Sequence, residues 1–165
     1  MIEIKSDKII TPDGVKNGYL YIDNRFIAGV YTEKQPANER YDFTGRYVSA
    51  GFIDTHTHGG NGHPFINGTE EDVIGACNFH LTHGTTAILP TVTAGAFETM
   101  RKAVDTIAAA KNTGRIKSYV IGAHMEGPYL SAKQCGAQCP AFITSPKKED
   151  YEKLADDRSE ERRVG

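Results

Sequence analysis

Apolar residues in the first part of the chain alternate with polar ones and are separated by short turn sequences. The stretches 2–10, 19–22 and 26–31 are rich in Ile, Tyr and Val, and a Thr-Pro-Asp-Gly turn at 11–14 ends the first of them. Alternation with a period of two is typical of half-buried β-strands, and short polar connections favour antiparallel pairing. The pattern therefore predicts a small antiparallel β-meander within residues 1–47.

Beyond residue 47 the apolar pattern changes to strand-like runs that alternate with helix-like segments. We expect three strands, at 48–54, 85–90 and 118–124, and three helices, at 69–83, from a Thr93 cap to Asn112, and from Ser145-Pro146 onward. Strands that alternate with helices in this way are typical of parallel βαβ units. We therefore expect an α/β fold for this part of the chain.

Composition and charge narrow the class of protein. The chain has 165 residues, with 19 Lys and Arg against 21 Asp and Glu, so it carries no basic field for nucleic acid. No apolar run approaches the ~20 residues of a membrane helix. The three cysteines (Cys77, Cys135 and Cys139) are too few for a disulfide scaffold, which favours the cytoplasm. The chain is shorter than the ~250 residues of a complete (β/α)8 barrel.

His56 and His58 carry the strongest chemical signal. They follow the apolar run 48–54 and precede a glycine-rich loop. Residues i and i+2 of a strand point to the same side, so both imidazoles can converge on one cation. Neutral imidazole suits Zn²⁺ or Fe²⁺. The pair therefore predicts a metal site, and the alternative is two solvated histidines on a surface loop.

Glu126 is the candidate for a third metal ligand. It stands at the end of the predicted strand 118–124, where a carboxylate can meet ligands from a neighbouring strand end. The alternative for Glu126 is a helix-capping or salt-bridging role. His124 shares its face, and support of the ligands, contact with a substrate and simple packing remain equally open for it.

The remaining cysteines and histidines have weaker signals. Cys135 and Cys139 form a C-x3-C pattern in a polar loop and are interpreted as ordinary thiols. His63, His80 and His83 are expected to have structural or solvated roles. Neither a phosphate-binding G-x-x-x-x-G-K-[ST] loop nor a G-x-S-x-G nucleophile turn is present in the sequence.

Four segments resemble a known family of hydrolases. The run 51–60, GFIDTHTHGG, resembles the metal-binding start of the amidohydrolase superfamily. The runs 83–86 (HGTT) and 124–130 (HMEGPYL), followed by 136–138 (GAQ), are similar to the N-acetylglucosamine-6-phosphate deacetylase family. The resemblance extends from the N-terminal strands to about residue 150.

The resemblance implies an α/β fold made of a partial (β/α)8 TIM barrel of the amidohydrolase type, preceded by a small N-terminal β-sandwich segment. Residues 1–47 are then part of the sandwich, and 48–157 are the first three βα units of the barrel. The resemblance also implies one or two divalent cations, Zn or Fe, in the site. The implied metal ligands are Glu126, His56 and His58, and the implied substrate-binding residues are Ala137 and Gln138.

The implied reaction is hydrolysis of the acetamide of N-acetyl-D-glucosamine 6-phosphate to D-glucosamine 6-phosphate and acetate, in amino-sugar catabolism or cell-wall recycling. The implied partner is this small amino-sugar phosphate, with no nucleic acid and no membrane, and the full-length protein is expected to be a homodimer. In the family an aspartate on a late strand is the general base, and two more histidines bind metal. After Glu126 this sequence has no histidine, so we assign no catalytic base within it.

We therefore expect a truncated chain that is inactive alone. Residues 158–165, RSEERRVG, resemble the translation of a sequencing adapter and are expected to be non-native, the alternative being a solvated helical tail.

Two other functions stay open. One is another amidohydrolase of the dihydropyrimidinase type, which commonly uses a bridging lysine that has no counterpart at a strand end here. The other is a non-catalytic module that binds sugar phosphates.

Overall fold

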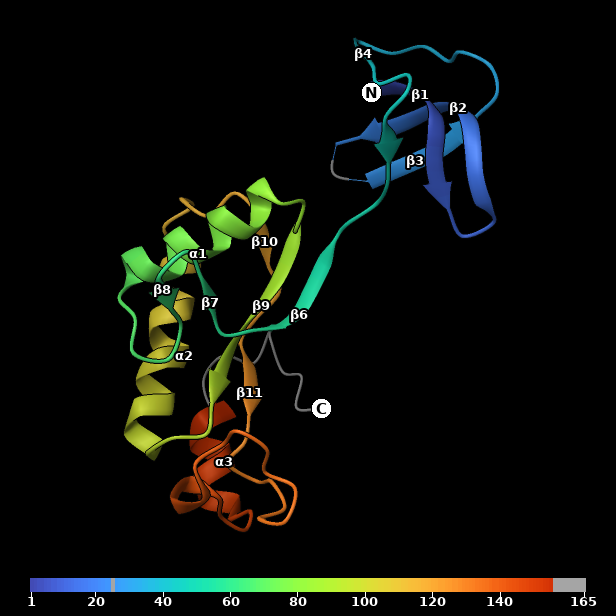
Figure 1. Cartoon of the computed structure of the whole chain (residues 1–165). Coiled ribbons are helices and arrows are strands. Elements are labelled where there is room, and N and C mark those ends of the chain that lie inside the picture. Colours follow the sequence, from blue (N-terminus) through green and yellow to red (C-terminus); the bar gives the residue numbers. More distant parts are fainter. Residues whose placement is uncertain (25, 156–165) are drawn as a thin grey trace. The chain divides into compact units, whose positions relative to one another are not determined.

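The computed structural model describes residues 1–24 and 26–155 (Figure 1). It divides into two compact units, Met1–Ala50 and a second unit that begins at Gly51. The predicted division at 47/48 lies close to this point. The segment 158–165, expected to be non-native, is outside the described residues. None of the described helices is long and apolar enough to cross a membrane.

The first unit is a five-stranded sheet. Its strands are β1 (Ile2–Thr11), β2 (Gly14–Asp23), β3 (Phe26–Tyr31), β4 (Glu39–Asp42) and β5 (Tyr47–Val48). The first three pair antiparallel, which confirms the predicted meander. The short strands β4 and β5 both pair parallel to β1. Nothing predicted β4, because its four residues are all exposed and show no apolar alternation.

A buried polar network ties the connection after β3 back to the meander. Glu3 is only 3% exposed, and its Oε2 accepts hydrogen bonds from the Tyr21 hydroxyl at 2.5 Å and from Arg40 Nη1 at 2.6 Å. The Tyr21 hydroxyl in turn accepts from the Gln35 backbone N–H at 2.6 Å. A buried carboxylate needs such partners to offset the loss of its hydration. The network therefore fixes β4 beside β1.

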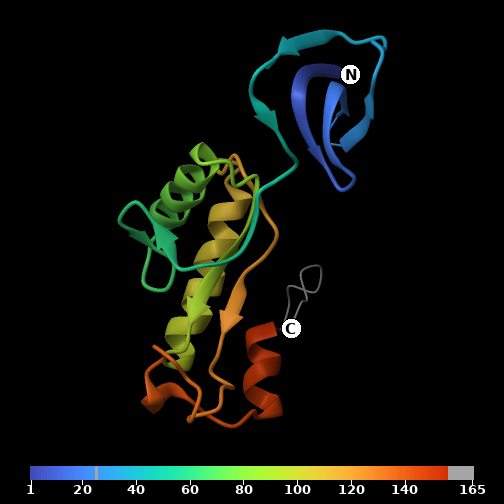
Figure 2. The same ribbon diagram turned by 45° about the vertical axis from the view of Figure 1, so that its right-hand side comes forward.

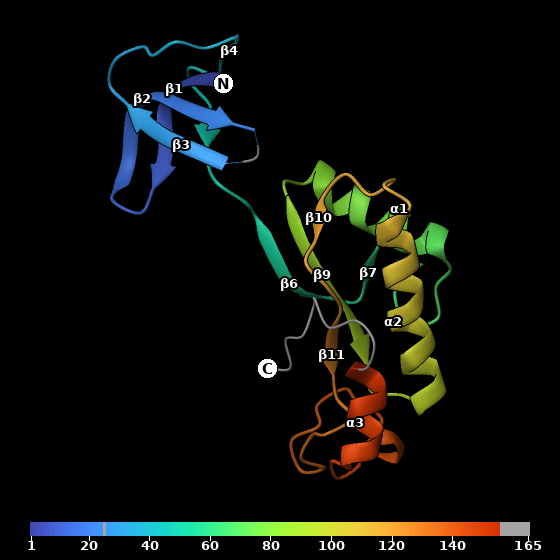
Figure 3. The same cartoon turned by 180° about the vertical axis from the view of Figure 1, so that it is seen from behind.

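The second unit is a parallel sheet covered on one face by two helices (Figures 1 and 3). Its main strands are β6 (Ile53–Thr57), β9 (Ala87–Thr93), β10 (Tyr119–Val120) and β11 (His124–Glu126). The central strand β9 pairs parallel with each of the other three. The helices are α1 (Glu70–Thr82) and α2 (Phe97–Asn112). The predicted βαβ order is thus confirmed. The described strands form an open sheet, so the barrel stays a prediction.

Shorter elements connect these strands and helices. The hairpin β7 (Gly59–Gly60) and β8 (His63–Pro64) lies between β6 and α1. After β11 the chain continues through a 3-10 helix, η1 (Pro140–Phe142), to α3 (Lys148–Ala155), as Figure 2 shows.

The core of the second unit lies between β9 and the two helices. Val73 and Cys77 of α1 meet Ile88 of β9 and Met100 and Ile107 of α2, and each of these side chains is at most 2% exposed. Burial raises the pKa of the Cys77 thiol to about 12, so this cysteine serves as a packing residue. The apolar spacing of 69–83 therefore reflects core packing, as expected.

Several predicted boundaries differ from the structure, among them the start of the third helix, which begins at Lys148 and not directly after Ser145-Pro146. Thr93 does not cap the second helix: it is the last residue of β9, and α2 starts at Phe97 after an Ala96 cap. The first strand lies later than predicted, so His56 is inside β6. The predicted strand 118–124 is broken into β10 and β11.

Candidate metal centre

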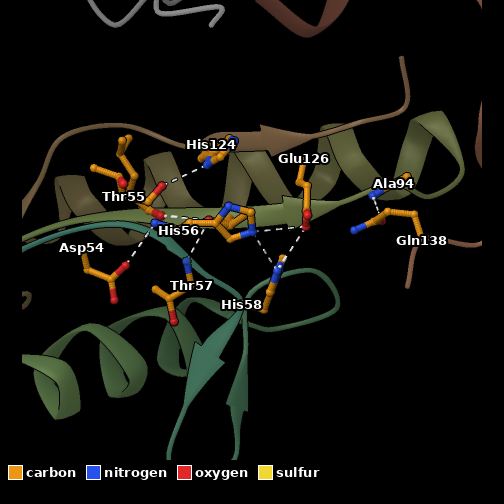
Figure 4. Close-up of polar contacts among 11 residues, drawn as sticks. Asp54, Thr55, His56, Thr57, His58, Ala94, His124, Glu126 and Gln138 are labelled. Carbon is orange, nitrogen blue, oxygen red and sulfur yellow. Dashed lines mark hydrogen bonds and ion pairs between the residues drawn. The ribbon is translucent and has the colours of Figure 1, made fainter. Parts of the chain in front are cut away.

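His56, His58 and Glu126 lie together at the carboxyl ends of two strands that flank β9 (Figure 4). The two histidine Nε2 atoms are 3.2 Å apart. Glu126 Oε2 lies 3.3 Å from His56 Nε2 and 3.2 Å from His58 Nε2. The structure therefore brings together the three residues that the sequence singled out as ligands.

The spacing of these three atoms fits a shared cation. Zn–N and Zn–O bonds are about 2.0–2.2 Å long, so the ligand atoms of a tetrahedral site lie roughly 3.4 Å apart. Glu126 Oε2 is buried and has no hydrogen-bond donor among the described residues. Unprotonated imidazole nitrogens and a carboxylate oxygen repel one another at this distance unless a cation or a proton lies between them. The donor set, two nitrogens and one oxygen, suits zinc or iron.

Two side chains, one a hydroxyl and one a carboxylate, hold the backbone of β6 beside the histidines in place. The Thr57 backbone N–H donates to Thr91 Oγ1 at 3.0 Å, and Thr91 is only 1% exposed in β9. The His56 backbone N–H donates to Asp54 Oδ1 at 3.0 Å. On the other side of β9, Glu126 pairs with Thr93 in the β11 ladder. The central strand therefore sets the positions of both histidines and of the glutamate.

His124 lies beside the three-residue group and outside it. Its Nδ1 donates to the Thr55 carbonyl at 2.9 Å, and its ring meets the His56 ring edge-on with centroids 4.9 Å apart. Because a carbonyl only accepts, the proton of His124 is on Nδ1. Of the alternatives that the sequence left open, this geometry favours support of His56.

Gln138 binds the end of β9 through its side chain. Its Oε1 accepts a hydrogen bond from the Ala94 backbone N–H at 2.9 Å (Figure 4). Ala137 is exposed on the same loop, between the free cysteines Cys135 and Cys139. The substrate-binding role of Ala137 and Gln138 stays a prediction.

The other histidines make local contacts. His63 Nδ1 lies 2.9 Å from Asp72 Oδ1, while His83 bonds to the Phe79 carbonyl of its own helix. Thr91 and Asp54 are contributors that sequence reasoning missed. Their partners are backbone atoms, which leave no spacing signal in a sequence.

A parallel α/β sheet with two histidines and a glutamate at its carboxyl edge is an arrangement of the amidohydrolase kind. No family model matches the chain. It is 33% identical over 127 residues to the N-acetylglucosamine-6-phosphate deacetylase of Homo sapiens, and the matched region covers 75% of this chain and 31% of the human protein. It is 36% identical over 118 residues to the N-acetylgalactosamine-6-phosphate deacetylase of Shewanella sp., and the matched region covers 71% of this chain and 29% of the Shewanella protein.

Solved structures give the same result. The N-acetyl-D-glucosamine-6-phosphate deacetylase of Mycobacterium smegmatis matches with a TM-score of 0.79 and 28% identity, over 94% of this chain and 44% of that one. The enzyme of Pasteurella multocida matches equally well, over 94% of this chain and 41% of that one. The chain is therefore a relative of the N-acetylglucosamine-6-phosphate deacetylases, which confirms the resemblance. It spans less than a third of the human and Shewanella proteins.

Proposed function

We propose that this chain supplies the metal-binding part of a deacetylase that converts N-acetyl-D-glucosamine 6-phosphate to D-glucosamine 6-phosphate and acetate. The convergence of His56, His58 and Glu126 on one point carries this proposal. The deacetylase names of the relatives supply the substrate class. A related structure from Mycobacterium smegmatis is a complex with N-acetyl-D-glucosamine-6-phosphate, which supports an amino-sugar phosphate as the ligand.

In this proposal each residue of the site has a defined task. His56 and His58 bind a divalent cation through Nε2, and Glu126 binds it through Oε2. When bound, such a cation lowers the pKa of a water molecule and polarises the amide carbonyl. His124 keeps the His56 ring in place, and the Gln138 loop faces the end of β9 where the sugar would lie. Zinc or iron, as one or two ions, fits this set of ligands.

The general base is the missing component. The acidic residues after Glu126 are confined to positions 149–161, and the described ones lie on α3, which offers no carboxylate to the metal-binding group. Without a base to take and return the proton, the attack of water and the departure of the amine are both slow. We therefore propose that the chain is a truncated, inactive part of an enzyme that is cytoplasmic and dimeric when complete, with the partial barrel and sandwich as its frame.

The neighbouring epimer is a second candidate substrate. The relative from Shewanella, at 36% identity, acts on N-acetylgalactosamine 6-phosphate by its name. The two sugars differ only at carbon 4, so the same amide chemistry serves both. Competition between the two sugar phosphates in the complete enzyme distinguishes them.

The proposed function is tested first by metal binding and then by the downstream gene sequence. The chain should bind zinc tightly, and Glu126→Gln should weaken this binding at least tenfold, while the exposed Glu149→Gln control should leave it unchanged. The DNA that follows codon 157 should encode two histidines and then an aspartate at strand ends. A stop codon there, or a wild-type chain that binds no metal, would contradict the proposal.

A further inference from the structure

We infer that His80 of α1 is a positioning residue, which holds the metal-binding group in place by fixing the backbone directly after His58. This inference rests on the proposed metal site. His80 Nε2 lies 3.0 Å from the Gly59 carbonyl and donates its hydrogen bond there. The helix that carries His80 lies beside β7, which starts at Gly59 (Figure 1). His80 thus acts from a well-packed helix on the residue that follows His58.

The Gly59 carbonyl accepts a second hydrogen bond, from the residue on the other side of His58. The Thr57 hydroxyl also donates to the Gly59 carbonyl, at 3.3 Å, and lies 3.4 Å from His80 Nε2. The Thr57 backbone is itself bonded to Thr91. His58 is therefore held between two anchored neighbours, and its own carbonyl accepts from the Phe65 N–H at 3.1 Å.

Gly59 explains why an anchor is needed here. Its φ is +143°, a backbone conformation that residues with a side chain rarely adopt. A Cβ at this position would lie 2.2 Å from the His63 carbonyl oxygen. Glycine is the residue with the greatest backbone freedom, so an untethered Gly59 would let His58 move. A metal ligand must be held to within about half an ångström to keep its geometry.

Gly60 makes room for the His80 ring. A Cβ on Gly60 would lie 2.8 Å from His80 Nε2, so only glycine allows the ring this close to the strand. Glycine is therefore required at the two adjacent positions for different reasons. Gly59 turns the chain, and Gly60 admits the imidazole that fixes the turn. This arrangement assigns His80 a task that the apolar spacing of its helix does not reveal.

The hydrogen bond can be separated from packing by a pair of variants with nearly the same shape. His80→Gln keeps an N–H near the position of Nε2, whereas His80→Met has similar length and no donor. His83→Gln is the control, because His83 is the exposed C-cap residue of the same helix and its Nδ1 bonds to the Phe79 carbonyl and the adjacent Thr82 hydroxyl. The readouts are the affinity for Co²⁺ and the visible absorption of bound Co²⁺, at low protein concentration.

We expect His80→Met to weaken Co²⁺ binding by about tenfold and to change its absorption bands, as loss of a residue behind a metal ligand typically does. His80→Gln should restore most of the affinity, and His83→Gln should match the wild type. Equal affinity and spectra for His80→Met and the wild type would overturn the inference and leave the proposed function intact. Equal loss in both His80 variants would overturn it as well, because packing alone would then matter.

Two further outcomes are decisive. A wild-type chain without Co²⁺ bands would contradict the proposed metal site itself, and the inference would fail with it. If His80→Met does not fold, as judged by circular dichroism, Thr57→Val takes its place, because it removes the other donor to the Gly59 carbonyl with no change in size. Weaker Co²⁺ binding in Thr57→Val supports the tether, and unchanged binding overturns it.

Discussion

At the scale of the residue, Glu126 is the side chain on which the site depends. Its Oε2 is buried, and the Nε2 atoms of His58 and His56 lie 3.2 and 3.3 Å from it. A buried acceptor that has no donor costs about 1–3 kcal/mol. A bound cation removes this cost, and so does a proton on His56 or His58. The two possibilities predict opposite effects of substitution in the absence of metal.

The variant Glu126→Gln distinguishes a metal site from an ion pair between Glu126 and a protonated histidine. If the group is a metal site, the Gln amide can donate to a neutral imidazole, so the free energy of unfolding without metal should stay the same or rise, while stabilisation by added zinc should be lost. Chemical denaturation with and without zinc measures both effects, and Glu149→Gln is the control. If Glu126→Gln destabilises the chain by several kcal/mol without metal, the group is an ion pair and the metal site is wrong.

The sequence grouped the three candidate ligands but did not identify the residues that position them. His56, His58 and Glu126 could be grouped because strand alternation and shared strand ends place like-facing side chains together. Thr91 and His80 could not, because their partners are a backbone N–H 34 residues away and a backbone carbonyl 21 residues away. Such contacts depend on how β9 and α1 pack, which no local pattern encodes.

At the scale of the element, α1 shows how a local signal can fix a helix end. Thr69 and Asp72 form a reciprocal capping box, and Asp72 also contacts His63 of β8 at 2.9 Å. The predicted segment 69–83, which rested on apolar spacing, agrees closely with this helix, and the cap lies at its first residue. Thr93, by contrast, was wrongly predicted to cap the second helix. A β-branched hydroxyl residue suits strands as well as caps, and here β9 extended through it.

Asp72 should make the stability of the chain depend on acid pH. Hydrogen bonds from the Thr69 backbone, from His63 and from the Thr69 hydroxyl lower the pKa of Asp72 from 3.8 to about 2. A carboxyl with a lowered pKa stabilises the fold above its unfolded pKa, and this contribution is lost as the pH falls from about 4 to 2. Asp72→Asn should therefore unfold at a lower temperature at pH 7, with a smaller further decrease on acidification.

The measurement is thermal unfolding followed by circular dichroism at several pH values. Asp150→Asn is a suitable control, since Asp150 lies on a different helix, α3, and forms no capping box in the described helices. Wild type and Asp72→Asn with the same slope of melting temperature against pH would contradict this role of Asp72.

At the scale of the whole molecule, the second unit leaves apolar side chains exposed along its sheet. Phe52 is 65% exposed, Ile53 64% and Tyr119 61%, and they lie at or beside β6 and β10, on the two sides of β9. Within the described residues β6 pairs only with β9 among the strands of this sheet, so its outer edge is open. An open edge with exposed apolar residues promotes association between chains.

The chain should therefore self-associate as its concentration rises. Ile53→Lys places a charge on the open edge and should reduce the mass-average size seen by light scattering, whereas Phe142→Lys, at an exposed apolar residue of η1, should not. A wild-type chain that stays monomeric at high concentration, or an equal effect of both substitutions, would contradict this assignment of the edge.

We also expect the chain to bind metal without turning over substrate. The chain contains the three metal-ligand candidates, and it contains no assigned general base, so a zinc-loaded sample should release no acetate from N-acetylglucosamine 6-phosphate above the rate of free zinc. An enzymatic acetate assay with and without a chelator checks this. Acetate release that depends on bound metal would show that this chain is catalytically sufficient.

The most direct test of the central claim is the zinc content and X-ray absorption spectrum of the purified wild-type chain after dialysis against limiting zinc. We expect at least one bound zinc ion per chain, with imidazole nitrogens and a carboxylate oxygen at about 2.0–2.2 Å, and loss of this signal in Glu126→Gln. A chain that retains no zinc, or whose zinc spectrum is dominated by cysteine sulfur at about 2.3 Å, would contradict it.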